Sequence, residues 1–333
     1  MDKAAASEAY APAARDALRA FPIDATGLEL VSVSENVTFR VHDATDGAAY
    51  VLRLHRPGYH SLDELVSERT WIRALAEAGI AVPPPLNACD GRDYVGVSVA
   101  ATGESRYAGV SRWTEGRVLA EVLRQSESVG EVERYFEQLG VIAAAMHDQA
   151  SGWKTPTSFR RHALDTDGLM GEAPFWGRFW EHPGLPHAER SLLLETRASI
   201  RGALARFGRD ARTFSVIHAD LHPGNLLVNG DRLTVIDFDD SGFGWHQYDA
   251  AVALFHSQTR GEFATIERAF VRGYRSTRDI SNEALALIPM FLLIRGMAVI
   301  GWINQRPELD TSEYFQWLRE TVCTQCRTFE PPC

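Results

Sequence analysis

The sequence lacks an excess of basic residues. Its 333 residues include 34 lysines and arginines against 44 aspartates and glutamates, so the formal net charge is −10 at pH 7. Nucleic acids and anionic membranes are bound through basic patches, and this balance therefore argues against both classes of partner. The same balance is compatible with a cationic ligand but does not require one.

Long uninterrupted hydrophobic runs and a targeting segment are also missing. The most apolar stretch, residues 285–303, is interrupted by Pro289 and Arg295, which favours a buried core helix over a membrane span. The first 21 residues contain acidic side chains and no apolar run, so we expect neither a signal peptide nor a transit peptide. These features predict a cytoplasmic protein.

Cysteine is scarce, with only four residues in the chain. Cys323 and Cys326 form a C-x-x-C pair, a spacing found in zinc sites and in redox-active proteins. No second pair of cysteines or histidines stands near it in the sequence, and both thiols fall on one face of a helix-like stretch. We interpret them as ordinary thiols, with a metal or redox role as the alternative. The other two cysteines are Cys89 and Cys333.

Neither internal repeats nor low-complexity tracts occur, and the composition is that of a globular protein, with 45% hydrophobic and 23% charged residues. The length predicts about two domains. Alternating apolar and β-branched residues predict strands, and a helix is expected after Ser61, a plausible N-cap. The strands are expected at about 28–34, 36–42, 49–55, 93–100 and 106–113, and helices at 8–21, 62–80, 129–147 and 188–207.

These elements predict an α+β protein. We expect a small, mostly antiparallel sheet with one helix packed on it in an N-terminal β-rich lobe, residues 1–112. A hinge should follow at 113–117. Residues 118–333 should form a mainly helical C-terminal lobe with a hairpin embedded in it.

The hairpin lies in the segment VIHADLHPGNLLVNGDRLTVIDFDD, residues 216–240. Pro223-Gly224 predicts a turn, and Asn229-Gly230 between two apolar runs predicts a β-hairpin. This hairpin should bring the end of the segment back toward its beginning.

Five polar residues in this segment suggest a site. Mg²⁺ prefers oxygen ligands, which Asn225 and Asp237 supply, and Asp220 would then be left to accept a hydroxyl proton. The alternative is an acidic turn, but the spacing H-x-D-x-x-x-x-N from His218 to Asn225, followed by D-F-D ending at Asp239, favours a phosphoryl-transfer site.

At these residues the chain resembles the aminoglycoside phosphotransferase and choline kinase superfamily. IHADLHPGNLLV and VIDFDDSGFGWHQYDAAVAL are similar to that family's catalytic and metal loops, and VLRLHRP is similar to the stress response kinase A and type II homoserine kinase branches. The resemblance implies a two-lobed, protein-kinase-like fold that uses ATP and Mg²⁺. It implies that Asp220 is the catalytic base, that Asn225 and Asp237 hold the metal, and that Asp249 is structural.

The chain departs from protein kinases at the turn that should cover the phosphates. VSENVTFRV has no G-x-G-x-x-G pattern. The resembling family often uses a turn of serine and asparagine there, so Ser34, Asn36 and Thr38 are candidates for phosphate contacts. An ordinary polar hairpin is the alternative.

A second departure concerns the third strand, where the resemblance calls for a lysine and the chain has Arg53. Arginine is always charged and can donate two hydrogen bonds, but it is longer and planar, so the exchange is not neutral. We expect Arg53 to face away from Leu52 and Leu54 and to pair with Glu68 on the following helix, with Glu64 as the alternative.

Other residues have less specific roles. Trp113 and Glu115, in the expected hinge, are candidate nucleotide contacts. His222, Asp239 and Asp240 are candidates for substrate binding, with support of the loop as the alternative. His147 should cap or pack, and four aromatic residues should either wall a substrate pocket or fill the core: Trp176, Trp180, Trp245 and Tyr248.

Three functions follow from these patterns. The first is an ATP-dependent kinase for a small hydroxylated molecule such as an aminoglycoside, choline, an amino acid or an amino alcohol. The second is a bacterial protein Ser/Thr kinase, although no A-P-E segment follows Asp237. The third, suggested by Arg53, is a nucleotide-binding protein that has lost the transfer reaction.

Overall fold

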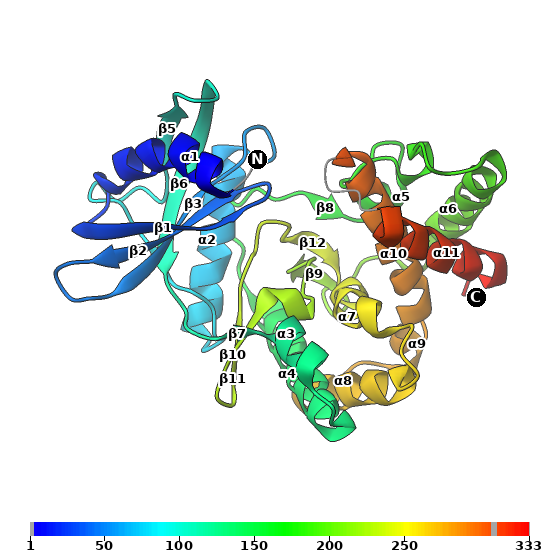
Figure 1. Cartoon of the computed structure of the whole chain (residues 1–333). Coiled ribbons are helices and arrows are strands. Elements are labelled where there is room, and N and C mark those ends of the chain that lie inside the picture. The colour runs from blue at the N-terminus through cyan, green and yellow to red at the C-terminus, as the bar shows by residue number, and fades with distance from the viewer. Residues whose placement is uncertain (1–2, 308–311, 333) are drawn as a thin grey trace. The chain divides into compact units, whose positions relative to one another are not determined.

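The chain divides into two compact units in a computed structural model that describes residues 3–307 and 312–332 (Figure 1). Unit 1 comprises Met1–Arg117, Lys154–Arg161 and Leu227–Asp239, and unit 2 comprises Val118–Trp153, His162–Leu226 and Asp240–Cys333. The sequence expectation assigned everything after residue 117 to one lobe. The contacts instead group the hairpin, and a short segment around residue 158, with the β-rich unit.

Unit 1 is built on an antiparallel sheet with the order β1-β2-β3-β6-β4, and β5 pairs with β6. The five strands expected from alternation are confirmed with bounds shifted by a few residues, and β4 is an addition. The strands are β1 (Ala25–Val33), β2 (Val37–Asp43), β3 (Ala49–Leu54), β4 (Pro85–Leu86), β5 (Val95–Val99) and β6 (Glu104–Arg112).

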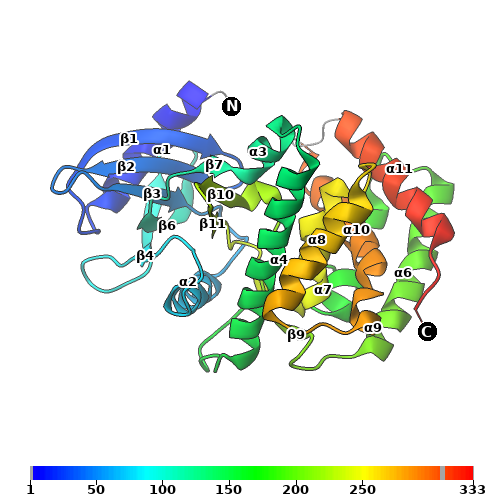
Figure 2. The same ribbon diagram turned by 90° about the horizontal axis from the view of Figure 1, so that it is seen from below.

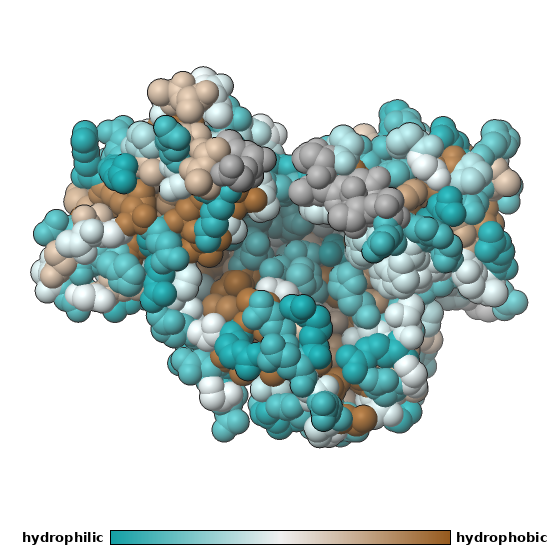
Figure 3. Space-filling model, in the orientation of Figure 1, coloured by the Kyte–Doolittle hydropathy of each residue, from teal (hydrophilic) through white to brown (hydrophobic). Residues whose placement is uncertain are grey.

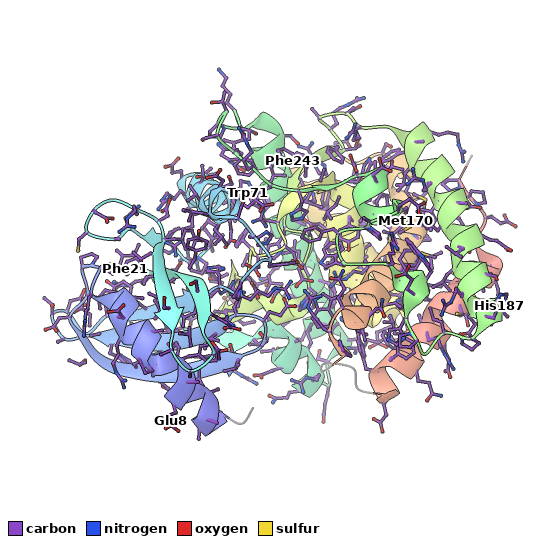
Figure 4. All side chains as sticks on the ribbon, turned by 90° about the horizontal axis from the view of Figure 1, so that it is seen from above. Glu8, Phe21, Trp71, Met170, His187 and Phe243 are labelled. Carbon is purple, nitrogen blue, oxygen red and sulfur yellow. The ribbon has the colours of Figure 1, made fainter. Side chains whose placement is uncertain are left out.

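Two helices cover this sheet, one on each face, as Figures 1 and 2 show from two directions. Helix α1 (Lys3–Leu18) presents buried alanines to the strands, and α2 (Leu62–Glu77) begins with the expected cap, a capping box between Ser61 and Glu64. Figure 4 labels Glu8 on α1 and Trp71 on α2, on opposite sides. The prediction of one packed helix was therefore incomplete.

Unit 2 is mainly helical. Figures 1 and 2 show α4 and α8 lying side by side and α10 passing beside α11. A small sheet of order β8-β12-β9 lies among the helices. The strands are β8 (Ala163–Leu164), β9 (Phe214–Ile217) and β12 (Gly242–Trp245). The helices are α3 (Leu119–Gln125), α4 (Val129–Gly152), α5 (Thr166–Met170), α6 (His187–Phe207), α7 (His246–Leu254), α8 (Phe263–Thr277), α9 (Asn282–Leu285), α10 (Ile288–Asn304) and α11 (Ser312–Thr328).

The apolar stretch near the C-terminus is a core helix, as predicted. Within the described residues, Asn282–Asn304 is the one helical stretch long and apolar enough to span a membrane, but 78% of its 18-residue window is buried inside the protein. The outer surface is largely hydrophilic over α4 and α8, whereas hydrophobic side chains gather where α1 crosses the strands of unit 1 (Figure 3).

The expected hairpin is present as β10 (Leu226–Asn229) and β11 (Arg232–Val235), which form a three-stranded sheet with β7 (Arg117–Val118). Its turn differs from the prediction. Asn229 still belongs to the strand, and of the residues around the turn only Gly230 has a positive φ, of 60°. The turn pair is therefore Gly230-Asp231, because glycine alone supplies the left-handed backbone that the turn requires.

The C-x-x-C pair lies in a helix, as the sequence indicated. Cys323 and Cys326 are buried in α11 and free, and burial raises their pKa values to about 12 and about 11. Thiols with such pKa values stay protonated at neutral pH, which disfavours metal binding and redox chemistry. Cys89 is exposed, and Cys333 lies outside the described residues.

Two glycines allow α4 and α8 to cross closely. A Cβ atom on Gly140 would lie 2.0 Å from the carbonyl oxygen of Phe270, and one on Gly273 would lie 1.9 Å from that of Glu137. Backbone cannot yield as a flexible side chain can, so both positions require glycine for steric reasons.

We expect Gly140→Ala to lower the free energy of unfolding by about 1–3 kcal/mol, because the methyl group overpacks this crossing. Gly202→Ala is the matched control, since a Cβ there meets only the Arg206 side chain, at 3.5 Å. That change should stabilise α6 by about 0.5–1 kcal/mol. Urea denaturation measures both, and equal midpoints for the two variants would contradict the close crossing.

Candidate functional site

The loop after β9 is held by the buried carboxylate of Asp249. The backbone N–H groups of His218 and Ala219 donate to its two oxygens at 3.0 and 2.7 Å. Ala219 has a φ of 67°, a left-handed conformation that disfavours residues with a Cβ. Asp249 is fully buried, so these bonds form away from water and offset the backbone strain. This geometry fits the structural role expected for Asp249.

His147 supports the same carboxylate. Its Nε2 lies 3.1 Å from Oδ2 of Asp249 and its Nδ1 lies 2.9 Å from the hydroxyl of Tyr274. Since a carboxylate only accepts hydrogen bonds, Nε2 carries the proton and Nδ1 accepts from the tyrosine. The imidazole also stacks on His246 with a centroid distance of 4.2 Å. His147 thus packs, as predicted, and also positions Asp249, which the sequence did not indicate.

Asp220 lies in this loop with both carboxylate oxygens engaged. Arg295 donates from Nη2 to Oδ1 at 2.7 Å, Asn225 donates from Nδ2 to Oδ2 at 2.8 Å, and Nε2 of His222 lies 3.3 Å from Oδ2. Burial raises the pKa of Asp220, but His222 and Arg295 outweigh burial and bring it well below its usual range. Asp220 is therefore a carboxylate at neutral pH.

The orientation of Asn225 leaves its amide oxygen for a cation. The amide nitrogen donates to both the carboxylate and the backbone carbonyl of Asp220, the latter at 2.9 Å. Its Oδ1 consequently points away from these bonds, and amide oxygens are suitable ligands for Mg²⁺. His222 stabilises the turn between Asp220 and Asn225, because its Nδ1 accepts a hydrogen bond from the backbone N–H of Gly224 at 2.9 Å.

Arg295 was missed as a site residue by the sequence analysis. It comes from the apolar helix α10, and its side chain is 12% exposed. The available signal was a single arginine in an otherwise apolar run, because a buried charge is costly unless it has a partner.

The four aromatic candidates separate into two groups. Trp176 donates from Nε1 to Oδ2 of Asp240 at 3.1 Å and stacks on Tyr248 with a centroid distance of 5.7 Å. Trp180 lies against the guanidinium of Arg197 and Trp245 is fully buried. The first pair adjoins Asp240, a substrate candidate, whereas the second pair fills the core.

Within unit 1, Arg53 pairs with Asp237. Its Nη1 donates to Oδ1 of Asp237 at 2.9 Å, and the Asp237 side chain is 41% exposed. Leu52 and Leu54 are fully buried on the opposite face of β3, as predicted, and Thr38 is the cross-strand partner of Arg53. Burial lowers the pKa of Arg53, but the nearby carboxylates, Asp237 first, raise it above its usual value.

The predicted pair between Arg53 and Glu68 is wrong as a direct contact. Glu68 is buried, and its nearest guanidinium is that of Arg161, at 4.0 Å. Arg53 instead uses the less buried carboxylate of Asp237, which needs less desolvation to form an ion pair. Glu64, the alternative, is engaged in the capping box of α2.

Asp239 joins several segments of unit 1. Its Oδ2 accepts from the amide of Asn36 at 3.1 Å, and its Oδ1 lies 3.5 Å from Nδ1 of His55. Its backbone carbonyl interacts with Nε2 of His60 at 2.7 Å and accepts from Arg161. The carboxylate thus contacts the β1–β2 turn and the end of β3, and the position of Asp239 is that of a structural centre.

Asn36 is engaged on both sides of its amide. Its Oδ1 accepts from the backbone N–H of Arg56 at 3.0 Å, while its Nδ2 donates to Asp239. Ser34, in the same turn, is exposed, and Thr38 lies in β2. The turn therefore presents an exposed serine, and its asparagine supports the fold.

Trp113 and Glu115, the candidate nucleotide contacts in the expected hinge, both contact Arg40 of β2. The guanidinium of Arg40 lies 4.4 Å from the ring centroid of Trp113 and donates to Glu115 at 2.7 Å. Both residues are thereby fixed to the sheet of unit 1 by a single cation.

The sequence matches the phosphotransferase enzyme family over residues 27–283. It is 25% identical over 279 residues to amicoumacin kinase of Bacillus subtilis (strain 168), covering 80% of this chain and 77% of that protein. It is 28% identical over 270 residues to homoserine kinase of Sinorhizobium medicae, covering 80% and 74%.

Solved structures show the same fold. A microcompartment-associated aminopropanol kinase has a TM-score of 0.79 at 29% identity, covering 98% of this chain and 95% of that chain. An amicoumacin kinase in complex with AMP-PNP and Ca²⁺ has a TM-score of 0.78 at 19% identity, covering 97% and 96%. The predicted α+β, protein-kinase-like fold is confirmed.

The histidines of unit 2 make stability depend on pH. Burial lowers the pKa of His147 to about 3 and that of His256 to about 4, and it lowers the pKa of His246 well below its usual value. Such groups stabilise the fold above an unfolded pKa of about 6.5, and this stabilisation is lost as the pH falls. Burial raises the pKa of Asp249 to about 6, which means that ionisation of this carboxyl group costs free energy in the folded protein. This cost is removed as Asp249 becomes protonated below about pH 6, so Asp249 opposes the histidines.

Burial also lowers the pKa of His60 in unit 1, to about 4. Because four such histidines oppose Asp249, we expect the free energy of unfolding to fall between about pH 6.5 and 5, by up to about 1.4 kcal/mol per pH unit for each net proton. His147→Gln should flatten this slope by about one proton. Urea denaturation at several pH values measures it. His187→Gln, on the exposed face of α6 (Figure 4), is the control and should keep the slope; an unchanged slope in His147→Gln would contradict the assignment.

Proposed function

Because the chain belongs to the phosphotransferase enzyme family, we propose that it transfers the γ-phosphoryl group of ATP, with Mg²⁺ bound, to a hydroxyl group of a small amine-bearing molecule. The family and the relatives establish a phosphotransferase that acts on a hydroxyl group of a small molecule, as the resemblance in the sequence implied. The choice of ATP and Mg²⁺, the roles of the residues and the acceptor class are the proposal.

The observation that carries this proposal is the state of Asp220. It is a carboxylate whose two oxygens are oriented by Arg295, Asn225 and His222. Its lowered pKa makes it a weak base, but phosphoryl transfer passes through a loose transition state in which little proton transfer is needed early. Asp220 therefore acts mainly by accepting a hydrogen bond from the acceptor hydroxyl and aiming its oxygen, and it takes the proton late.

Asn225 and Asp237 are the proposed metal ligands. The amide oxygen of Asn225 is directed away from Asp220, and the carboxylate of Asp237 is partly exposed, so both present oxygen atoms of the type that Mg²⁺ prefers. The bound ion would neutralise charge on the transferring phosphoryl group. Asp237 also has a φ of 65°, and Asp tolerates this conformation better than most residues.

The other proposed nucleotide contacts are residues of unit 1. Arg53 holds Asp237 and keeps further donors for phosphate oxygens, and the exposed hydroxyl of Ser34, together with Thr38, is assigned to the phosphates. Asn36 and Glu68 are assigned a supporting role. The Asn36 amide is already engaged by Asp239 and Arg56, and Glu68 is buried near Arg161. Trp113 and Glu115 are assigned to the remainder of the nucleotide.

The proposed acceptor carries an amine. Homoserine and aminopropanol, the substrates in the names of two relatives, each combine a hydroxyl group with an amine. Asp240, next to Trp176, supplies a negative charge for an ammonium group. We place the enzyme in the cytoplasm, where ATP is available.

We expect Asp220→Asn to lower transfer of label from γ-labelled ATP to small molecules of a cell extract by at least about 100-fold, because the amide cannot accept the proton. Asp231→Asn, an exposed change on the neighbouring hairpin, is the control and should be fully active.

Chelation of divalent metal should stop the transfer and added Mg²⁺ should restore it. Label that appears on protein and depends on Asp220 would favour a protein kinase instead. Transfer that Asp220→Asn leaves intact would refute the mechanism.

We expect Arg53→Lys to raise the KM for ATP about tenfold, since the shorter ammonium loses one of the two directions in which the guanidinium donates. Steady-state kinetics with varied ATP measures the change. Arg15→Lys, on the surface of α1, is the control. A large gain of turnover in Arg53→Lys would mean instead that the natural protein is tuned away from catalysis.

A further inference from the structure

Arg295 has more donor capacity than its contact with Asp220 uses. A guanidinium has five N–H donors, and the bond from Nη2 to Oδ1 of Asp220 accounts for one of them. The other oxygen of Asp220 is already contacted by Asn225 and His222. Burial of an arginine in the apolar helix α10 is costly, and orientation of one carboxylate oxygen does not require it.

Tyr248 supplies a second donor at the same place. Its side chain is fully buried, Arg295 lies close enough to donate to the phenol oxygen, and the O–H group has no acceptor among the described residues. Tyr248 and Asp240 are, with Asp220, the groups whose charge and polarity act on Arg295. A buried hydroxyl group whose proton has no acceptor costs free energy, and a ligand that supplies the acceptor removes this cost. Guanidinium and phenol donors together suit a carboxylate.

Asp240 supplies a negative group near Tyr248. Trp176 stacks on the Tyr248 ring, with an interplanar angle of 15°, and donates from Nε1 to Asp240. This stack connects a carboxylate, at Asp240, with a guanidinium, at Arg295. Asp220 is reserved for the acceptor hydroxyl, so the other two charges form a pair of opposite sign that suits a zwitterion.

We propose that Arg295 and Tyr248 bind a carboxylate of the acceptor while Asp240 binds its ammonium group, so that the acceptor is a hydroxy amino acid. This proposal rests on the proposed function and narrows its acceptor class. An amino alcohol without the carboxylate leaves the donors of Arg295 and Tyr248 unmatched, and a site built for a polar group discriminates strongly against an analogue that lacks it.

Three matched pairs of acceptors test the assignment, because the members of each pair differ only in a carboxylate. They are L-serine and ethanolamine, L-threonine and 1-amino-2-propanol, and L-homoserine and 3-amino-1-propanol. In at least one pair, kcat/KM for the amino acid should exceed that for the amino alcohol by at least about tenfold, the effect of one charge-assisted hydrogen bond.

Arg295→Gln should bring this ratio to about one. The variant also disturbs Asp220, but that effect is common to both members of a pair and cancels in the ratio. Arg295→Lys keeps the positive charge but lacks the two parallel N–H donors of a guanidinium, so it should retain part of the ratio. Asp240→Asn should weaken both members and leave the ratio unchanged. Arg275→Gln, on the exposed surface of α8, is the control.

A ratio of one or less in all three pairs, with the amino alcohols phosphorylated, would overturn the assignment and leave the proposed function standing. If none of the six is phosphorylated, calorimetric binding in the presence of ADP decides. Tighter binding of the amino acids that is lost in Arg295→Gln supports the assignment, and binding without preference overturns it. The proposed function fails separately, through the absence of Asp220-dependent label transfer.

Discussion

The buried carboxylate of Asp249 is the constraint on which the site depends. It accepts hydrogen bonds from the backbone of two consecutive residues in the loop after β9 and so holds Ala219 in a left-handed conformation. Without these bonds the strained residue would relax, and Asp220, one position later, would change direction. His147 of α4 in turn contacts the carboxylate of Asp249 in α7, so two helices of unit 2 support the loop that carries Asp220.

A second buried carboxylate plays a comparable part in unit 1. Asp239 draws together the β1–β2 turn, the end of β3 and the segment around Arg161. Burial raises the pKa of this carboxyl group, but His55 and Arg53 outweigh it and bring the pKa well below its usual range. Asp237, two residues earlier, is thereby presented on an ordered segment. Each unit thus contains a structural aspartate that supports the segment carrying a proposed catalytic or metal-binding residue.

Charge around Asp220 determines the chemistry that we propose. A carboxylate with a strongly lowered pKa is a poor general base but a good acceptor of a hydroxyl hydrogen bond, which suits a reaction that relies on positioning. Arg295 causes part of that lowering and also introduces a positive charge into a protein with a net charge of −10. The same guanidinium can therefore serve both to orient the acceptor and to select it.

The sequence alone determined what depends on neighbours along the chain. Alternation predicted the strands of unit 1, Ser61 predicted the cap of α2, and the sequence around Pro223-Gly224 predicted a turn between Asp220 and Asn225. Only the tertiary structure decided the partners that come from distant elements: Arg295 on α10 for Asp220, and Asp237 instead of Glu68 for Arg53. Local patterns fix which way a side chain points on its own helix or strand, whereas packing fixes which distant group it meets.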